Sequence, residues 1–505
     1  MPSGFRRFAI RAGLAVLGVI LFCGITSFPS LVFLPYVALV PWAVLYMGPR
    51  RPGVSPIYFL VAGTLCFILC YRPMFGLGWL VPLAAAPFFI PAWLLFPLLA
   101  RPIQRLGLPR SLTLPAVWVA VEWARLLTAA GHFDLYALGY SQARLAPLVQ
   151  IADLTGVYGI SFLVAAVDGL LADACFALKD AAWRPRILLR ERAIVIPAIA
   201  IAAAFAAVVG YGFLRLETAK DTPGPRLAIY HPDSPVLPAN ADLTVWPGNA
   251  ILDDIDHAKA HLDALGWLAS REQAMVLLGA EGQVEGQPGR TTNSAFLVDA
   301  AGTLRGRYDK QILFPFAEYL PLDRAVGVVA PQIERAYRRL VRRAWASPST
   351  RVPGTHMTLF DLPWKYERLP FAAAIGVESA YPALVAGAGR SGARFVVNVT
   401  SEGGIGGVLE EQLLRVCMLR AIENRIAFVR AANTGVSGFI DPQGRWHGEA
   451  AGNVPLSPLG TTTYAASHDA FALVCVAVSL WLLARALLRG RPTMTPIGVP
   501  AGATI

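Results

Sequence analysis

The segment 308–321 holds the residues of this chain that are best suited to chemistry. It reads Tyr-Asp-Lys-Gln-Ile-Leu-Phe-Pro-Phe-Ala-Glu-Tyr-Leu-Pro, so Lys310 and Glu318 stand among apolar and aromatic residues. An unpaired charge is expensive to bury in such surroundings, and charges kept there usually belong to a site or to an ion pair. These residues alone leave both interpretations open: a functional lysine with a carboxylate partner, or a structural ion pair on a rigid loop.

The composition indicates a membrane protein. The chain has 505 residues, of which 55% are hydrophobic and 15% are charged, and this is too apolar for an ordinary soluble protein. The formal net charge of +11 is compatible with nucleic-acid binding. However, the arginines cluster in short loops between apolar runs, which is the pattern that membrane topology requires. We therefore expect no nucleic-acid partner.

Eight apolar runs are long enough, or nearly so, to cross a bilayer. They cover residues 9–27, 29–47, 54–71, 77–100, 112–130, 157–178, 193–214 and 469–488. Arginine clusters precede the first run and follow the second, fourth, sixth and eighth, so a cytoplasmic N-terminus places all of them in the cytoplasm. The large polar segment after the seventh run then lies outside the membrane, and both termini are cytoplasmic.

That polar segment has the pattern of one α/β domain. Short β-type runs alternate with helical patterns such as 254–269 and 410–425, which is typical of a layered sheet core. We expect a seven-helix transmembrane region at 1–215, an extracytoplasmic domain at 216–467, an eighth transmembrane helix at 468–489 and a short cytoplasmic tail at 490–505.

The cysteines and histidines argue against a disulfide or a metal in the outer domain. Five of the six cysteines lie within apolar runs, and only Cys417 belongs to the polar segment, so that segment has no internal disulfide. The seven histidines are scattered and no metal-type spacing occurs. We expect no metal and no cofactor.

Residues 333–345 form a separate pattern. Apolar residues recur there at helical spacing, with arginines around the opposite side. We favour a basic amphipathic helix that lies on anionic headgroups, because the domain is tethered to the bilayer at both ends. The alternative is an ordinary solvated helix that covers the domain.

Over nearly its full length the chain resembles the bacterial apolipoprotein N-acyltransferases. The resemblance rests on the plan of seven spans, an outer domain and one further span, and on a set of motifs. These are Leu-Gly-Tyr-Ser-Gln at 138–142, Gln-Ile-Ala-Asp-Leu-Thr-Gly-Val-Tyr-Gly-Ile-Ser-Phe-Leu at 150–163, Tyr-Asp-Lys at 308–310, Phe-Pro-Phe-Ala-Glu-Tyr-Leu-Pro at 314–321, Arg-Ala-Ile-Glu-Asn-Arg at 420–425, Arg-Ala-Ala-Asn-Thr-Gly-Val-Ser at 430–437 and Ile-Asp-Pro-Gln-Gly at 440–444.

The resemblance implies a nitrilase-like αββα sandwich, of the carbon-nitrogen hydrolase type, on a multi-span α-helical membrane base of eight helices. Family members move an acyl chain from a phospholipid to the α-amino group of the lipid-modified N-terminal cysteine of a lipoprotein. A carboxylate activates a cysteine, the cysteine takes the acyl group as a thioester, and a lysine stabilises the oxyanion. We therefore expect a monomeric protein of the bacterial inner membrane with a periplasmic domain, and with phospholipid and a lipoprotein N-terminus as partners.

Two of the three catalytic groups of that family are absent from the matching positions. Its Trp-Pro-Glu appears here as Trp-Pro-Gly, so the base position is Gly248. Its Ile-Cys-Tyr-Glu appears as Ile-Gly-Val-Glu, so the nucleophile position is Gly376. Lys310 is retained as the oxyanion stabiliser, and Glu318 and Glu378 keep the positions of supporting carboxylates. Two further family segments are altered, at 131–134 and 400–406.

Two hypotheses follow from this pattern. The first is a pseudoenzyme of the family that keeps the fold and the lipid or lipoprotein cleft but cannot form a thioester, because such catalytic groups act as a unit. Lys310 then persists because deleting one member of a buried charge cluster costs more than keeping it.

The second hypothesis is an active acyltransferase or hydrolase that uses relocated groups. The candidate nucleophiles are Ser379, Ser401 and Cys417, and the candidate carboxylates are Glu378, Glu402, Glu281 and Glu285. The helical pattern around Cys417 favours core packing for that thiol. Glu281 and Glu285 are expected on a Gly-rich loop, where carboxylates are usually solvated.

Overall fold

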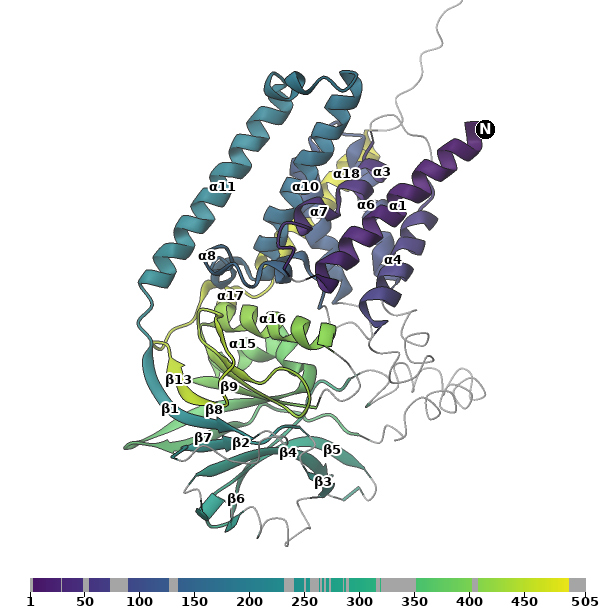
Figure 1. Ribbon diagram of the computed structural model, residues 1–505. Coiled ribbons are helices and arrows are strands. Elements are labelled where there is room, and N and C mark those ends of the chain that lie inside the picture. Colours follow the sequence, from purple (N-terminus) through teal and green to yellow (C-terminus); the bar gives the residue numbers. More distant parts are fainter. Residues whose placement is uncertain are drawn as a thin grey trace, which may run out of the picture.

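The computed structural model shows a helical bundle joined to an α/β domain (Figure 1). It describes residues 3–28, 30–48, 54–72, 90–126, 135–230, 240–248, 251–254, 263, 266–267, 269–271, 274–284, 286–287, 290–314, 318, 351–401 and 407–489. Several expectations therefore lie outside the described residues: the amphipathic helix at 333–345, the altered segment at 131–134, the tail at 490–505, Glu285, Glu402 and most of the helix at 254–269.

The bundle contains four described helices that are long and apolar enough to cross a membrane: α1 (Ser3–Ser27), α10 (Val157–Asp180), α11 (Arg192–Glu217) and α18 (Ala470–Leu488). They match the first, sixth, seventh and eighth expected spans. The other elements before the domain are α2 (Pro35–Ala38), α3 (Val40–Tyr46), α4 (Ile57–Cys70), η2 (Pro91–Leu94), α6 (Leu95–Gln104), α7 (Arg110–Arg125), η3 (Leu138–Gln142), α8 (Ala146–Val149), α9 (Ala152–Thr155) and η4 (Pro185–Leu189).

The prediction of eight spanning helices is confirmed only for these four. The second expected span is divided into α2 and α3, and each begins with a proline in its first turn, where the missing N–H costs least. In the third and fifth spans, α4 has 14 residues and α7 is described over 16, both short of the roughly 20 that a bilayer needs. The fourth expected span lies partly outside the described residues.

The α/β domain is built on two sheets. In the described part, one sheet has seven strands in the order β13-β1-β2-β4-β5-β6, with β3 also paired to β4, and the other has six in the order β12-β11-β10-β9-β8-β7. The first sheet uses β1 (Thr222–Ile229), β2 (Leu243–Val245), β3 (Ile251–Asp254), β4 (Met275–Gln283), β5 (Thr291–Val298), β6 (Leu304–Asp309) and β13 (Ala451–Leu456). The second uses β7 (Leu359–Trp364), β8 (Glu367–Ile375), β9 (Phe395–Thr400), β10 (Ala427–Ala432), β11 (Gly438–Ile440) and β12 (Trp446–His447).

The sheets pack face to face around one apolar core. Side chains of both sheets, including Leu227, Leu277, Phe371 and Val397, form a single buried cluster. The outer face of the second sheet is covered by α15 (Pro382–Arg390) and α16 (Gly407–Asn424), whose buried residues share a cluster with the helical bundle. The α/β domain with two sheets is therefore nitrilase-like in its layers, as expected.

α16 joins the domain to the bundle through polar contacts as well as apolar ones. The backbone N–H of Val157, at the start of α10, donates to Glu423 Oε1 at 3.0 Å. Arg425, directly after α16, pairs with Asp153 at 2.7 Å. Glu423 also pairs with Arg420 on α16, and both side chains are completely buried. Since buried charges are tolerated only when paired, these contacts hold the domain in one orientation on the bundle.

Candidate active site

The candidate site lies where strands of both sheets end. Lys310 follows β6, and the short helix η5 (Gly376–Ala380) follows β8. β8 runs parallel to β9, with Ile375 opposite Val399, so Gly376 and Thr400 meet at the same sheet edge. Gly248 follows β2, and its N–H donates to the carbonyl of Thr400 at 3.1 Å. The sheet register thus brings four distant segments of the chain to one place.

Lys310 and Glu318 form a buried ion pair. The amine Nζ of Lys310 lies 2.6 Å from Oε2 of Glu318, and their side chains are 5% and 7% exposed. Oε1 of Glu318 accepts from Nδ2 of Asn293 at 2.8 Å and from Arg351 at 2.9 Å. Burial by itself would raise the pKa of Glu318, but the charge of Lys310 and these hydrogen bonds outweigh it and lower the pKa to about 2. Glu318 is therefore an ionised carboxylate that fixes the position of the Lys310 amine.

Arg351 extends this pair into a network. It lies 2.7 Å from Oε1 of Glu281 and 2.9 Å from Oε1 of Glu318. The expectation that Glu281 lies on a loop is wrong, because Glu281 belongs to β4, in register with Asn293 of β5. The sequence analysis also missed Arg351, which follows a long segment that carries no matching motif.

Glu378 has a different role from Glu318. Its carboxylate accepts hydrogen bonds from the Tyr308 hydroxyl at 3.0 Å, from the backbone N–H of Gln311 at 2.7 Å and of Ile312 at 3.0 Å, and from that of Ile375 at 2.8 Å. Burial raises the pKa of Glu378 above its ordinary range, although the charge of Lys310 and the backbone donors act in the opposite direction. Glu378 thus ties the residues on both sides of Lys310 to the end of β8.

Gly376 leaves open space in front of Lys310. A β-carbon on residue 376 would stand 3.7 Å from Nζ of Lys310 and 3.9 Å from Oγ1 of Thr400, and nothing else lies within 4 Å. The backbone at Gly376 has φ +58°, a left-handed conformation that costs about 1–2 kcal/mol for other residues. A side chain at this position would therefore point at the amine that the family uses to stabilise an oxyanion.

Gly248 is in contact with the opposite sheet. A β-carbon there would lie 2.9 Å from the carbonyl carbon of Thr400 and 3.0 Å from the nitrogen of Ser401. These are backbone atoms, which cannot move aside as a flexible side chain can. A glutamate at position 248 would need a shift of the strand end at residues 400–401.

The proposed replacement nucleophiles are poorly placed for reaction. Cys417 on α16 is fully buried, and burial raises its pKa to about 11, so the thiolate is scarce at neutral pH. Ser379 is also fully buried, and its hydroxyl donates to the carbonyl of Gly376 at 3.3 Å. The Ser401 hydroxyl accepts from Nδ2 of Asn433 at 2.8 Å. The hydroxyl beside the empty nucleophile position belongs instead to Thr400, which sequence reasoning missed because its neighbours at 401–406 have diverged.

Within the described ranges, no three histidine, cysteine or carboxylate side chains lie close enough to hold a metal ion. The chemistry available at the site is electrostatic. One buried ammonium group faces an opening, and paired carboxylates fix its position.

The chain matches two family profiles. Residues 17–170 match the apolipoprotein N-acyltransferase N-terminal domain, and residues 225–460 match carbon-nitrogen hydrolase. Apolipoprotein N-acyltransferase from Geobacter metallireducens is 29% identical over 469 residues, with 85% of each chain covered. The protein of the same name from Agrobacterium fabrum is 29% identical over 413 residues, with 75% of this chain and 72% of that one covered.

Among solved structures, a mutant amidase of the nitrilase superfamily from Nesterenkonia is 16% identical, with a TM-score of 0.34, and the match covers 50% of this chain and 97% of that one. The two profile matches follow one another in the order in which the bundle and the two-sheet domain follow one another here, and they include Lys310, Glu318, Gly248 and Gly376. The chain belongs to the apolipoprotein N-acyltransferase family of the carbon-nitrogen hydrolase superfamily.

Proposed function

We propose that this protein is a non-catalytic apolipoprotein N-acyltransferase homologue, which keeps the lysine site of the family but does not form an acyl thioester. The observation that carries the proposal is the opening at Gly376: the retained Lys310 amine faces a position that has no side chain. The base position, Gly248, likewise has no side chain, and its backbone is packed against the Thr400 carbonyl. A lysine without its nucleophile and base can bind a carbonyl oxygen but cannot transfer the acyl group.

The family implies the partners and the location. Apolipoprotein N-acyltransferases act on phospholipids and lipoproteins, so the site at Lys310 is proposed to hold a phospholipid ester or a lipoprotein N-terminus. The four spanning helices support a membrane location, proposed to be the bacterial inner membrane, with both termini cytoplasmic and the domain at 216–467 periplasmic. The protein is proposed to work in lipoprotein maturation as a monomer, by binding lipids or lipoproteins or by modulating a complete enzyme.

An acyl-transfer assay tests this proposal. The purified full-length protein is incubated with a phospholipid that carries a tagged acyl chain and with a diacylated lipopeptide. The native protein is compared with Gly376→Cys, with Gly248→Glu/Gly376→Cys, and with Gly376→Ala as a control that has the same backbone strain but no thiol. We expect no transfer by the native protein or by Gly376→Ala.

The variants then separate the remaining possibilities. Transfer by the double variant would mean that the lipid path and the pocket persist and that only the reactive groups are missing. Transfer by Gly376→Cys but not by the double variant would mean that the glutamate distorts residues 400–401, as the contacts at Gly248 predict. Transfer by the native protein would overturn the proposal.

A second candidate function is an active acyltransferase or hydrolase with a relocated nucleophile. One observation favours it: Oγ1 of Thr400 lies 3.9 Å from the β-carbon position of residue 376, on the same side as Lys310. In such a reaction the Thr400 oxygen would bond to the acyl carbon and the lysophospholipid would leave with the hydroxyl proton. Native transfer that is abolished in Thr400→Val and kept in Ser401→Ala would establish this mechanism.

A further inference from the structure

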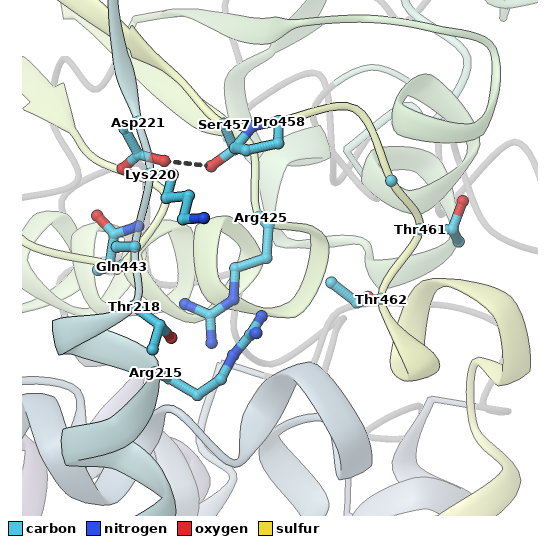
Figure 2. Close-up of a pocket in the computed structure, with 12 residues that line it drawn as sticks. Arg215, Thr218, Lys220, Asp221, Arg425, Gln443, Ser457, Pro458, Thr461 and Thr462 are labelled. Atoms are coloured by element: carbon cyan, nitrogen blue, oxygen red, sulfur yellow. Dashed lines mark hydrogen bonds between the residues drawn. The ribbon is translucent and has the colours of Figure 1, made fainter.

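A second polar pocket lies where α11 leaves the bundle and the chain enters the α/β domain. Its volume is about 270 Å³, and it is lined by the end of α11, by the segment before β1, by Arg425 and by the segment that leads to α17 (Thr463–Ser467). The side chains of Arg215, Lys220 and Arg425 converge on this space (Figure 2). We call it the Arg215 pocket. It shares no lining residue with the site at Lys310.

The Arg215 pocket has an excess of positive charge. Arg215 and Arg425 both pair with one carboxylate, Asp153, at 3.0 and 2.7 Å, and Asp221 accepts a hydrogen bond from the Ser457 hydroxyl at 2.6 Å. Three cations against two carboxylates leave one net positive charge. Within the part of the chain that the structure describes, Lys220 makes no ion pair.

Two features make the pocket suited to an anion. Nε of Arg425 is buried and donates to no group among the described residues, so it needs a partner that the protein does not supply. Arginine also presents its donors in a planar fork that matches the oxygens of a phosphate. A single phosphodiester would neutralise the net charge and satisfy this donor.

The position of α11 places the pocket at the level of lipid headgroups. α11 is the most apolar of the candidate spans, with only 6% of its apolar window buried in the protein, and Figure 1 shows it at the side of the bundle. Ile196 and Ile199 are 63% and 65% exposed, and Phe213 and Leu214, directly before Arg215, are 52% and 57% exposed. Such side chains face lipid tails in a membrane, so the cations that follow them lie where hydrocarbon gives way to headgroups.

We infer that the Arg215 pocket binds the phosphodiester headgroup of an anionic phospholipid from the leaflet that faces the domain, and that the acyl chains of this lipid lie along α11. The pocket is made by the last spanning helix before the domain and by the segments at both ends of the domain. A bound lipid would therefore stabilise the junction between bundle and domain. This site does not depend on whether the site at Lys310 transfers acyl chains.

Lipid binding to the purified full-length protein tests the inference. Native mass spectrometry in detergent measures the affinity for phosphatidylglycerol, for phosphatidylcholine, whose headgroup has no net charge, and for inorganic phosphate. The variants are Lys220→Gln and Lys220→Glu, because Lys220 is exposed and lies in a loop where neither change disturbs packing. Arg368→Gln is the matched control, since Arg368 is an exposed cation of the β7–β8 hairpin.

We expect phosphatidylglycerol to bind more tightly than phosphatidylcholine. Lys220→Gln should weaken phosphatidylglycerol binding about fivefold and Lys220→Glu about 25-fold, since each unit of charge near a membrane surface contributes about that factor. Arg368→Gln should leave binding unchanged. Equal affinity of the native protein and both Lys220 variants would overturn the inference.

Inorganic phosphate separates the two sources of this ligand chemistry. If phosphate displaces phosphatidylglycerol completely and binds as tightly, the ligand is a soluble phosphate and the lipid assignment is wrong. If it does not compete, the lipid assignment is supported. The acyl-transfer assay with Gly376→Cys is a separate readout, so failure of one proposal does not disguise failure of the other.

Discussion

The Lys310 amine lies 3.7 Å from the point where a β-carbon on Gly376 would stand. The group that the family uses to stabilise an oxyanion thus still faces the position from which the family nucleophile acts. The ion pair with Glu318 and the hydrogen bonds of Glu378 hold the surrounding backbone in place. What is missing at this site is a reactive side chain, while the arrangement around it persists.

A cysteine introduced at position 376 should be reactive. We expect Gly376→Cys to react with iodoacetamide at neutral pH, because a thiol beside Lys310 has a lowered pKa. Mass spectrometry of the modified peptides provides the measurement. The native Cys417 serves as an internal control, since its burial should keep it unlabelled. A folded Gly376→Cys variant whose introduced thiol resists labelling would contradict the assigned orientation of this position.

Removal of the Lys310 charge should destabilise the protein. Lys310→Met leaves the buried Glu318 with only Asn293 and Arg351 as side-chain partners, and we expect a loss of about 3 kcal/mol. Lys310→Met/Glu318→Gln should recover part of this loss, because no uncompensated charge remains. Thermal unfolding of the full-length protein in detergent measures both. A double variant less stable than the single one would refute the pairing.

The contribution of Glu318 to stability should depend on pH in a defined direction. Its pKa falls from the ordinary 4.5 to about 2 in the folded protein. The folded state therefore favours the ionised form, and the stabilisation is complete above pH 4.5 and is lost as the pH falls from 4.5 towards 2. The difference corresponds to about 3 kcal/mol.

The measurement for this pH effect is the difference in thermal stability between the native protein and Glu318→Gln at a series of pH values. The difference should be constant near neutral pH and should shrink below pH 4.5. Asp361→Asn, which removes an exposed carboxylate, controls for the general effect of losing a negative charge. A difference that grows in acid would show that the sign is wrong.

Gly248 should tolerate even a methyl group poorly. Gly248→Ala brings a β-carbon to 2.9 Å from the carbonyl carbon of Thr400, and we expect a loss of about 1–3 kcal/mol. Gly387→Ala is the matched control, because Gly387 lies in α15 with nothing within 4 Å of its β-carbon position. That change should stabilise the helix by up to about 1 kcal/mol. Equal melting temperatures of the two variants would contradict this account.

The junction between the bundle and the domain should depend on Asp153. This buried carboxylate pairs with Arg425 and Arg215 and accepts a hydrogen bond from the Tyr211 hydroxyl at 2.8 Å. Asp153→Asn should cost about 3 kcal/mol, because two arginines lose their charged partner. Arg144→Gln breaks a more exposed pair with Glu411 and should cost less than about 1 kcal/mol. Thermal unfolding of both variants decides whether burial sets the difference.

The expectations for the domain and for the spans succeeded to different degrees. The alternation of short apolar runs with helical patterns predicted a layered α/β domain, and two packed sheets are present. The count of eight spans rested on hydropathy alone, which does not distinguish one long helix from the broken pair α2 and α3. Hydropathy reports the surroundings of a segment, and prolines within it decide where its helices begin.

For the candidate site, the sequence by itself determined which groups are present. Lys310, Glu318 and Glu378 stand in motifs, and glycine at positions 248 and 376 excludes any side-chain chemistry there. These are properties of residue type and local order, so the sequence suffices for them. The same motifs pointed to the family that the profile matches then established.

The tertiary structure alone decided which groups meet. Arg351 reaches Glu318 and Glu281, and Thr400 lies beside the opening at Gly376, although these residues come from separate strands and loops. It also decided that Gly376 is open to Lys310 whereas Gly248 is blocked by backbone. Sheet register and the left-handed backbone at Gly376 set these outcomes, and both arise from pairing between distant segments, which residue type and local spacing do not specify.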